Sequence, residues 1–327
     1  MEISERNRQV YFNGEIVPES EARISIYDSA LMFGDMVFEM TRSFNKKQFL
    51  LEEHIDRLFN GLKILEIDPK LTKSELIEIC HKVQNINDHL FDSDDEHRLM
   101  INISRGPLGI YGGRVKGLKK EPTIIVADFP LKWTLTGMSR FYKDGINCVI
   151  PSQRAIPATL MDPKIKNRSR MWYQMANIEV SKFEGDNNWA LLIDPDGFIT
   201  EGTGNNFFMI KDGDIISPQP RNILRGTRRK YIFHLAKQLG INCYEKNIEP
   251  YDIYSADEAF ITGTPFCILP VTSFRHQEIG NGNFGDISKA LLEQWSLNVG
   301  LDIKQQIINY DSTQEKLTSS TPYKHIK

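Results

Sequence analysis

The sequence of 327 residues predicts an α+β protein with two domains, and three observations lead to this prediction. The length is roughly twice that of an average domain of ~150 residues. Predicted strands outnumber predicted helices in the second part of the chain and do not alternate regularly with them, which argues against a doubly wound sheet. The periodic patterns weaken near residues 129–140, so we expect a first domain over 1–131, a linker over 132–142 and a larger second domain over 143–310.

The first domain is expected to begin with strands. An Asn-Gly pair at residues 13–14 separates two apolar runs, which is the strongest short signal for a hairpin, here over residues 10–17. Residues 36–42 have the character of a further strand, and a turn at residues 45–47 follows it.

Two helices and two strands complete the first domain. Residues 52–65 predict an amphipathic helix, because apolar residues recur on one face. A second helix begins at Thr72, which forms a capping box with Glu75. Alternating apolar residues at 99–103 predict a strand with one buried face, and the apolar run at 123–127 suits a central strand. The buried stripe of the first helix consists of Ile55, Leu58, Phe59, Leu62 and Leu65.

The second domain is expected to combine short strands with three helices. A helix over residues 227–239 should end at Gly240, which is a common C-cap residue. From residue 311 the chain is rich in Ser, Thr and Lys, so we expect a mobile tail over residues 311–327. The other expected elements are strands at 147–150, 189–193 and 198–200, a hairpin at 207–216, and helices at 169–183 and 286–299.

The composition excludes several classes of protein. The net charge of −3 gives no basic surface for nucleic acid or for an anionic membrane. No apolar run approaches the ~20 residues that span a bilayer, and the N-terminus lacks the apolar stretch of a signal peptide. The four cysteines are scattered without the spacing of a disulfide framework or a metal site, so we expect a cytoplasmic enzyme without a metal.

A lysine, a glutamate and two Gly/Thr turns follow one another in the second domain. Lys166 is followed by the run TEGTGNNFF at residues 200–208, by RGTRR at 225–229 and by ITGT at 261–264. An amine can bind an aldehyde, a carboxylate can hold a protonated pyridine nitrogen, and backbone amides with hydroxyls can bind a phosphate. These are the groups that hold pyridoxal 5'-phosphate (PLP), so the sequence predicts a PLP enzyme.

Two lysines are candidates for the amine. Lys164 and Lys166 both lie in the run DPKIKN at residues 162–167. They are two residues apart, so in an extended segment they share a face, and periodicity does not choose between them.

From about residue 11 to residue 271 the chain resembles the class IV, or fold-type IV, aminotransferases. This family includes branched-chain and D-amino-acid aminotransferases, R-selective amine transaminases and aminodeoxychorismate lyase. Its anchoring lysine commonly lies four residues after the Asp of an Asp-Pro-x-x-Lys run, which selects Lys166 and leaves Lys164 as the alternative. The resemblance implies a two-domain fold-type IV enzyme, with a small N-terminal α/β domain and a larger β-rich domain with flanking helices, and it implies a homodimer.

The resemblance also implies which residues bind PLP. Glu201 matches the glutamate beside the pyridine nitrogen, Arg57 matches a phosphate-binding arginine, and Thr264 matches a phosphate-binding hydroxyl. The family has Gly-hydrophobic-Thr/Ser-Arg where this chain has Gly226-Thr227-Arg228-Arg229, so either Thr227 or Arg228 is expected to contact the phosphate. The cofactor-binding set is therefore Arg57, Lys166, Glu201, Gly226, Thr227, Arg228 and Thr264.

The substrate side is matched only in part. Residues 28–42 resemble the segment that lines the substrate pocket in the family, and they place Phe33, Phe38 and Arg42 there; the alternative is that these aromatic residues belong to the core. Branched-chain enzymes carry Tyr and Arg at positions that are Arg98 and Met100 here. D-amino-acid enzymes carry Arg and His where this chain has Ile110 and Gly112, and amine transaminases have a mobile arginine near Tyr111. We therefore expect Arg98 and Tyr111 to contact the substrate, with Arg105 and Arg114 as alternatives.

The resemblance implies a transaminase that works by a ping-pong mechanism through an internal aldimine at Lys166. The apolar character of Phe33, Phe38 and Met100 favours a branched-chain-like or hydrophobic amino donor, with a 2-keto acid as the acceptor. Three alternatives stay open from the residues: an aminodeoxychorismate-type lyase, a D-amino-acid or R-amine transaminase, and a non-catalytic PLP-binding protein.

Overall fold

The computed structural model describes residues 7–111 and 114–313, and the chain divides into two compact units. Unit 1 comprises Met1–Leu131 and Ile165–Arg170, and unit 2 comprises Lys132–Lys164 and Met171–Lys327. The segment Ile165–Arg170 falls in the range expected for the second domain, yet it packs with unit 1. Strands and helices occur in both units without regular alternation, so the predicted α+β fold class is confirmed.

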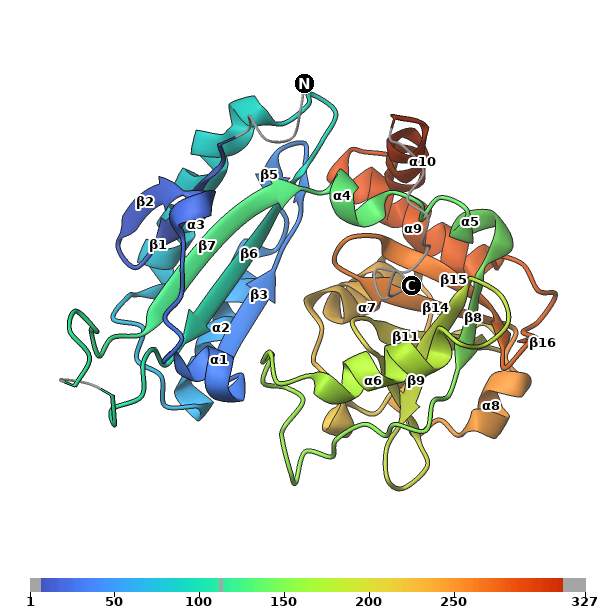
Figure 1. The fold of residues 1–327 in the computed structure, drawn as a ribbon. Coiled ribbons are helices and arrows are strands. Elements are labelled where there is room, and N and C mark those ends of the chain that lie inside the picture. Colours follow the sequence, from blue (N-terminus) through green and yellow to red (C-terminus); the bar gives the residue numbers. More distant parts are fainter. Residues whose placement is uncertain (1–6, 112–113, 314–327) are drawn as a thin grey trace. The chain divides into compact units, whose positions relative to one another are not determined.

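Unit 1 is built on a five-stranded sheet in the order β2-β1-β7-β6-β3, and every neighbouring pair is antiparallel (Figure 1). Asn13 and Gly14 both have positive φ and form the turn between β1 and β2, as the Asn-Gly pair predicts. The strands of this sheet are β1 (Gln9–Phe12), β2 (Glu15–Pro18), β3 (Met36–Met40), β6 (His97–Ser104) and β7 (Thr123–Pro130).

Two helices, α2 (Leu51–Ile64) and α3 (Lys73–Asn87), pack against one face of this sheet and enclose the core of the unit. The capping box between Thr72 and Glu75 is present as predicted. Of the predicted stripe on α2, Phe59 and Leu65 are only partly buried. The smaller elements of unit 1 are α1 (Ser29–Phe33), β4 (Ser43–Phe44) and β5 (Lys47–Gln48).

Strand alternation divides the side chains of β3 and β6 between the two faces of the sheet. Val37 and Ile101 belong to the core beneath the helices, so Phe38, Met40 and Asn102 point to the other face. We call this other face the substrate face, defined by Phe38, Met40, Met100 and Asn102. Its cross-strand pairs are Phe38 with Asn102 and Met40 with Met100.

Unit 2 contains a nine-stranded mixed sheet in the order β10-β9-β8-β15-β14-β11-β12-β13, with β16 paired to β15. Because β10 also pairs with β11, the strands from β10 to β11 close into a ring. The strands are β8 (Ile146–Val149), β9 (Asn188–Ile193), β10 (Ile199–Gly202), β11 (Asn206–Lys211), β12 (Asp214–Pro218), β13 (Cys243–Lys246), β14 (Glu258–Gly263), β15 (Cys267–Phe274) and β16 (Gln277–Glu278).

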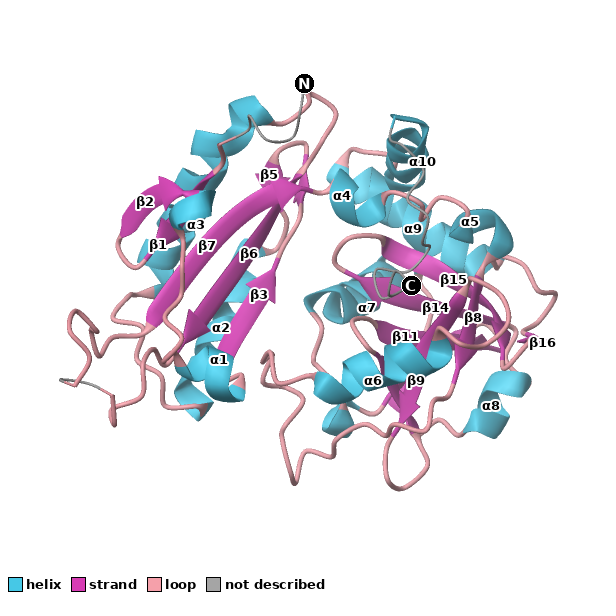
Figure 2. Cartoon of the chain, viewed as in Figure 1, coloured by secondary structure: helices cyan, strands magenta, loops and turns pink. Residues whose placement is uncertain are grey.

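Helices flank the sheet of unit 2 (Figure 2). Helices α7 (Thr227–Leu239) and α9 (Asp286–Val299) have the predicted bounds, whereas α6 (Met171–Val180) is shorter than expected at both ends. The remaining helices are α4 (Lys132–Leu135), α5 (Phe141–Asp144), α8 (Pro250–Tyr254) and α10 (Ile303–Thr313). None of the described helices is long and apolar enough to cross a membrane.

Helix α10 corrects the prediction of a mobile tail that starts at residue 311. Residues 311–313 belong to the helix, and the carboxylate of Asp311 accepts hydrogen bonds from the backbone amides of Gly137 and Ser139, the latter at 2.9 Å. The helix was missed because its sequence, IKQQIINYDST, is mostly polar; its buried apolar residues are Ile303, Ile307 and Tyr310. The rest of the expected tail, 314–327, lies outside the described residues.

Candidate active site

The chain returns to unit 1 at Lys166 and runs along the edge strand β3. The backbone amide of Phe38 donates to the carbonyl oxygen of Lys166 at 2.9 Å, and Asn167 forms an antiparallel bridge with Val37. The amine of Lys166 lies 4.7 Å from the centroid of the Phe38 ring. The structure thus places Lys166 beside Phe38, the predicted substrate-side aromatic residue.

Lys164 has a different environment, within unit 2. Its amine lies 2.7 Å from the carboxylate of Asp162 and donates to the carbonyl oxygen of Arg221 at 3.1 Å. A carboxylate and a carbonyl oxygen thus both engage the amine of Lys164. Of the two candidate lysines, Lys166 has the surroundings that suit a reacting amine.

Glu201 is a buried carboxylate with fixed orientation, only 5% exposed. The hydroxyl of Tyr173 donates to Oε1 at 2.9 Å, and Nδ2 of Asn206 donates to Oε2 at 2.8 Å. Asn206 faces Glu201 across the β10–β11 pair, which explains how the two side chains meet. These two hydrogen bonds fix the orientation of the carboxylate, which can pair with a protonated ring nitrogen.

The start of α7 suits an anion. Gly226 is its N-cap and provides no side-chain cap, Thr227 and Arg228 lie buried in the first turn, and no acidic residue lies there. The amides at the N-terminus of a helix carry partial positive charge and bind phosphate. A Cβ on Gly226 would lie 2.1 Å from Oδ1 of Asn206, so the close approach of the turn to Asn206 requires glycine.

Asn206 connects these parts of unit 2. Its Nδ2 donates both to Glu201 and, at 3.1 Å, to the carbonyl oxygen of Leu224 just before the α7 turn. It also pairs across the sheet with Thr262 of β14, which places the predicted Thr264 just beyond the end of the neighbouring strand. Glu201 and the Gly226 turn therefore both lie against one asparagine, to which the sequence reasoning assigned no role.

Arg229 follows the predicted phosphate-binding residues but has a structural role. Its Nε donates to the hydroxyl of Ser217 at 3.0 Å, and its Nη2 lies 2.6 Å from Oε1 of Glu245. These contacts tie α7 to β12 and β13 of the same unit.

Arg57 is held by two buried residues that sequence reasoning missed, Glu39 and His54. Its Nε and Nη2 contact the two carboxylate oxygens of Glu39 at 2.6 and 2.8 Å, and Nδ1 of His54 lies 2.7 Å from the same carboxylate. Glu39 and His54 are fully buried. Burial by itself would raise the pKa of Glu39, but the charges of Arg57 and His54 outweigh it and hold that pKa well below its usual range. The signal was the three-residue spacing of His54 and Arg57, which puts both on one side of α2.

The predicted substrate-side residues do not all gather at Phe38. Phe38 is 5% exposed, whereas Phe33 is 65% exposed at the end of α1. Arg42 is fully buried, and its guanidinium lies 3.8 Å from the ring of Phe44. Arg98 reaches the sulfur of Met40, on the same sheet face as Phe38. The remaining candidates have other contacts in unit 1: Tyr111 packs against Tyr27, Arg105 pairs with Asp35, and Arg114 is exposed. Of the positions compared with the family, Gly112 lies outside the described residues.

Two arginines that the sequence reasoning did not name lie at Phe38. The guanidinium of Arg168 is 3.6 Å and that of Arg170 is 5.2 Å from the Phe38 ring centroid. Arg168 also donates from Nε and Nη2 to Oδ1 of Asn102, at 3.3 and 3.1 Å. The sequence signal was the two-residue spacing from Lys166, which puts Lys166 and Arg168 on one side of an extended segment.

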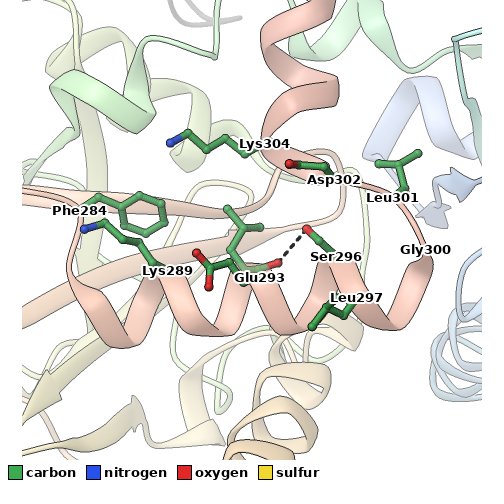
Figure 3. Close-up of a pocket in the computed structure, with 10 residues that line it drawn as sticks. Phe284, Lys289, Glu293, Ser296, Leu297, Gly300, Leu301, Asp302 and Lys304 are labelled. Carbon is green, nitrogen blue, oxygen red and sulfur yellow. Dashed lines mark hydrogen bonds between the residues drawn. The ribbon is translucent and has the colours of Figure 1, made fainter.

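A cavity of about 630 Å³ lies elsewhere in unit 2, beside α9 and α10 (Figure 3). Its lining includes Phe284, Lys289, Leu292, Leu301 and Lys304, and it contains none of the predicted site residues. Within the described part of the chain, no group of three or more His, Cys, Asp or Glu side chains could hold a metal ion. The candidate active-site residues are thus those around Lys166 and those around Glu201.

The chain is similar to known proteins over most of its length. The family model described as amino-transferase class IV matches residues 36–274. The chain is 35% identical over 288 residues to the "Putative branched-chain-amino-acid aminotransferase" of Methanocaldococcus jannaschii, which covers 88% of this chain and 95% of the relative. It is 31% identical to the D-alanine aminotransferase of Bacillus licheniformis, over 86% of this chain and 93% of the relative. A crystal structure of the Escherichia coli branched-chain amino acid aminotransferase has a TM-score of 0.78 and 27% identity, and covers 90% of this chain and 94% of that one.

Proposed function

The chain belongs to the class IV aminotransferase family and is a transaminase, and from that premise we propose that it uses PLP to move an amino group from a hydrophobic, branched-chain-like amino acid to a 2-keto acid. The observation that carries the proposal is the fixed, buried carboxylate of Glu201 between Tyr173 and Asn206, next to the uncapped start of α7.

The residues present fit PLP. When bound, PLP supplies an aldehyde and a ring that takes up electrons from the donor Cα. Lys166 would hold the cofactor by its amine, and that amine would then remove the donor Cα proton and return a proton during the second half-reaction. Glu201 would keep the proton on the pyridine nitrogen. The amides of the first turn of α7 from Thr227 onward, with Arg57, Arg228 and Thr264, would bind the phosphate, whereas the amide of Gly226 donates to the carbonyl oxygen of Leu224 at 2.8 Å.

The apolar side chains of the substrate face support a hydrophobic donor. Phe38, Met40 and Met100 are adjacent on β3 and β6. An apolar donor side chain would gain free energy by leaving water for such a surface. The names of several relatives also specify branched-chain amino acids.

Exposed apolar residues support a homodimer. Ile26, Leu31 and Phe33 are 70%, 61% and 65% exposed and lie close together in the sequence around α1. An exposed apolar group of this kind marks a surface for protein association. Light scattering of the purified protein should give twice the mass of the chain, and a monomer at micromolar concentration would contradict the proposal.

Borohydride reduction of the PLP-loaded enzyme tests which lysine holds the cofactor. Peptide mass spectrometry should find the reduced adduct on Lys166, and Lys166→Ala should lose both the adduct and transamination. Lys164→Ala is the matched variant and should keep both. An adduct on Lys164, or no adduct, would contradict the assignment.

A panel of donors tests the substrate class. Half-transamination should be faster with L-leucine, L-isoleucine and L-valine than with D-alanine or with an R-amine that lacks a carboxylate. A preference for D-alanine or the R-amine would contradict the proposed donor. Pyruvate release from aminodeoxychorismate without any keto acid would instead indicate the lyase.

A further inference from the structure

The Tyr and Arg that the family resemblance leads one to expect on β6 for the substrate carboxylate are absent, because Arg98 and Met100 occupy their positions. We infer that Arg168 binds the α-carboxylate of the amino donor and of the keto-acid acceptor. The inference rests on the proposed function, in which Lys166 is the reacting amine.

Arg168 lies where such a group is needed. The amine of Lys166 and the guanidinium of Arg168 lie 4.7 and 3.6 Å from the centroid of the same Phe38 ring. In an amino acid only one carbon separates the nitrogen from the carboxylate carbon, so both functional groups must be bound within a small space. Both cations lie beside one ring, and in the proposed complex each of them contacts one end of the same ligand.

Arg168 is also oriented for the task. Its Nε and Nη2 donate to Oδ1 of Asn102, which lies opposite Phe38 on the adjacent strand. The ring of Phe38 and the amide of Asn102 therefore fix the plane of the guanidinium. A planar guanidinium forms paired hydrogen bonds with a carboxylate, which an ammonium group does not do. Arg168 is exposed, so a ligand can reach it from solvent.

The other arginines are less well placed. Arg98 precedes Asn102 by four residues on β6, which separates them by about 13 Å at ~3.3 Å per residue. Arg105 is engaged by the carboxylate of Asp35, at 2.6 Å from Nε. Arg170 lies farther from the Phe38 ring than Arg168, at 5.2 Å, and its Nε donates to a backbone carbonyl of its own segment.

The test compares two ligands of one shape, 4-methylvalerate and its neutral amide, by calorimetric titration of the PLP-loaded enzyme. For Arg168→Gln we expect ~30- to 300-fold weaker binding of the acid, because a charged pair is lost. Binding of the amide should change by less than about threefold, because it does not depend on the charge. Arg168→Lys keeps the positive charge but loses the planar guanidinium, so its affinity for the acid should lie between that of Arg168→Gln and that of the wild type.

Matched variants decide between this inference and its rivals. Arg275→Gln removes an exposed arginine at the β15–β16 turn and should bind both ligands like the wild type. Equal binding of the acid by Arg168→Gln and wild type, or equal weakening of acid and amide, would overturn the inference. If Arg98→Gln instead weakened binding of the acid but not of the amide, the carboxylate would be assigned to Arg98.

The loading of the enzyme separates failure of the inference from failure of the proposed function. Borohydride should trap PLP on Lys166 in the wild type and in Arg168→Gln alike. No adduct in the wild type would refute the proposed function, whereas an adduct with unchanged acid binding refutes only the role of Arg168. If Arg168→Gln does not fold, Asn102→Ala is the alternative variant, because it removes the oxygen that orients Arg168. This variant should weaken binding of the acid by roughly 3- to 10-fold and leave binding of the amide unchanged. Equal effects on the binding of acid and amide would then overturn the inference.

Discussion

Replacing Glu39 by Gln removes a negative charge that has no contact with water in the folded unit. The carboxylate of Glu39 is fully buried and contacts Arg57 through two hydrogen bonds and His54 through one. Breaking a buried ion pair from one side costs about 3–5 kcal/mol, because the partner stays buried with its charge uncompensated. Gln keeps one acceptor oxygen, so we expect the free energy of unfolding to fall by ~3 kcal/mol, the lower end of that range. Urea denaturation at neutral pH measures it.

The dependence on pH gives a second test of the same ion pair. Although burial by itself acts in the opposite direction, Arg57 and His54 hold the pKa of Glu39 below its ordinary value of 4.5. A depressed folded pKa contributes stability that is fully present above pH 4.5 and is lost as the pH falls further. The advantage of the wild type over Glu39→Gln should therefore shrink by about 2 kcal/mol between pH 4.5 and pH 3.

The control is Glu78→Gln, an exposed glutamate on α3. This variant should stay within about 0.5 kcal/mol of the wild type at neutral pH, as surface substitutions do. A loss below about 1 kcal/mol for Glu39→Gln, or an advantage of the wild type that grows on acidification, would refute the ion-pair reasoning.

Three further predictions concern the rest of the molecule. Tyr173→Phe removes one donor to Glu201 and should weaken PLP retention in equilibrium dialysis by roughly 5- to 10-fold, about 1 kcal/mol; unchanged retention would contradict the role of that hydroxyl. Gly226→Ala places a Cβ against an amide oxygen and should lower the free energy of unfolding by about 2 kcal/mol, whereas Gly109→Ala, with open space around it, should change it little. Burial raises the pKa of Asp128 to about 6, so the folded protein holds this proton more tightly than the unfolded chain does. Relative to Asp128→Asn, the wild type should therefore lose up to ~1.4 kcal/mol of stability for each pH unit as the pH rises from 4 to 6. Denaturation across that range measures the difference, and a constant difference would contradict the raised pKa.

Local sequence signals predicted most elements of the fold because their causes are local. The capping box at Thr72 and the C-cap at Gly240 give α3 and α7 the expected ends. The parallel pairing of β8 with β15 could not be predicted, since it joins residues far apart in the chain, such as Ile146 and Val271. The short apolar stripe of α10 was hidden by its polar composition for a related reason: tertiary packing, not helix propensity, stabilises such a helix.

The candidate site was predictable where one residue has one chemical task. Glu201 and Lys166 could be named from their neighbours in the sequence. Their supporting residues could not be named, because Tyr173, Asn206 and Asn102 are ordinary polar residues whose roles arise only when strands and helices bring them together. The same limit explains why Arg57 could be identified without its buried partner Glu39.

The edge of β3 gives different surroundings to the two lysines between which spacing left the choice open. Residues 163–165 form a turn, so the alternation of side chains that would place Lys164 beside Lys166 does not extend back across it. After the turn, Asn167 bridges to Val37, and an extended segment must direct the residues before and after that bridge to the same side. Lys166 and Arg168 therefore both reach Phe38, 4.7 and 3.6 Å from its ring. One strand pairing thus positions both the amine that we propose as the reacting group and the guanidinium that we assign to the substrate carboxylate.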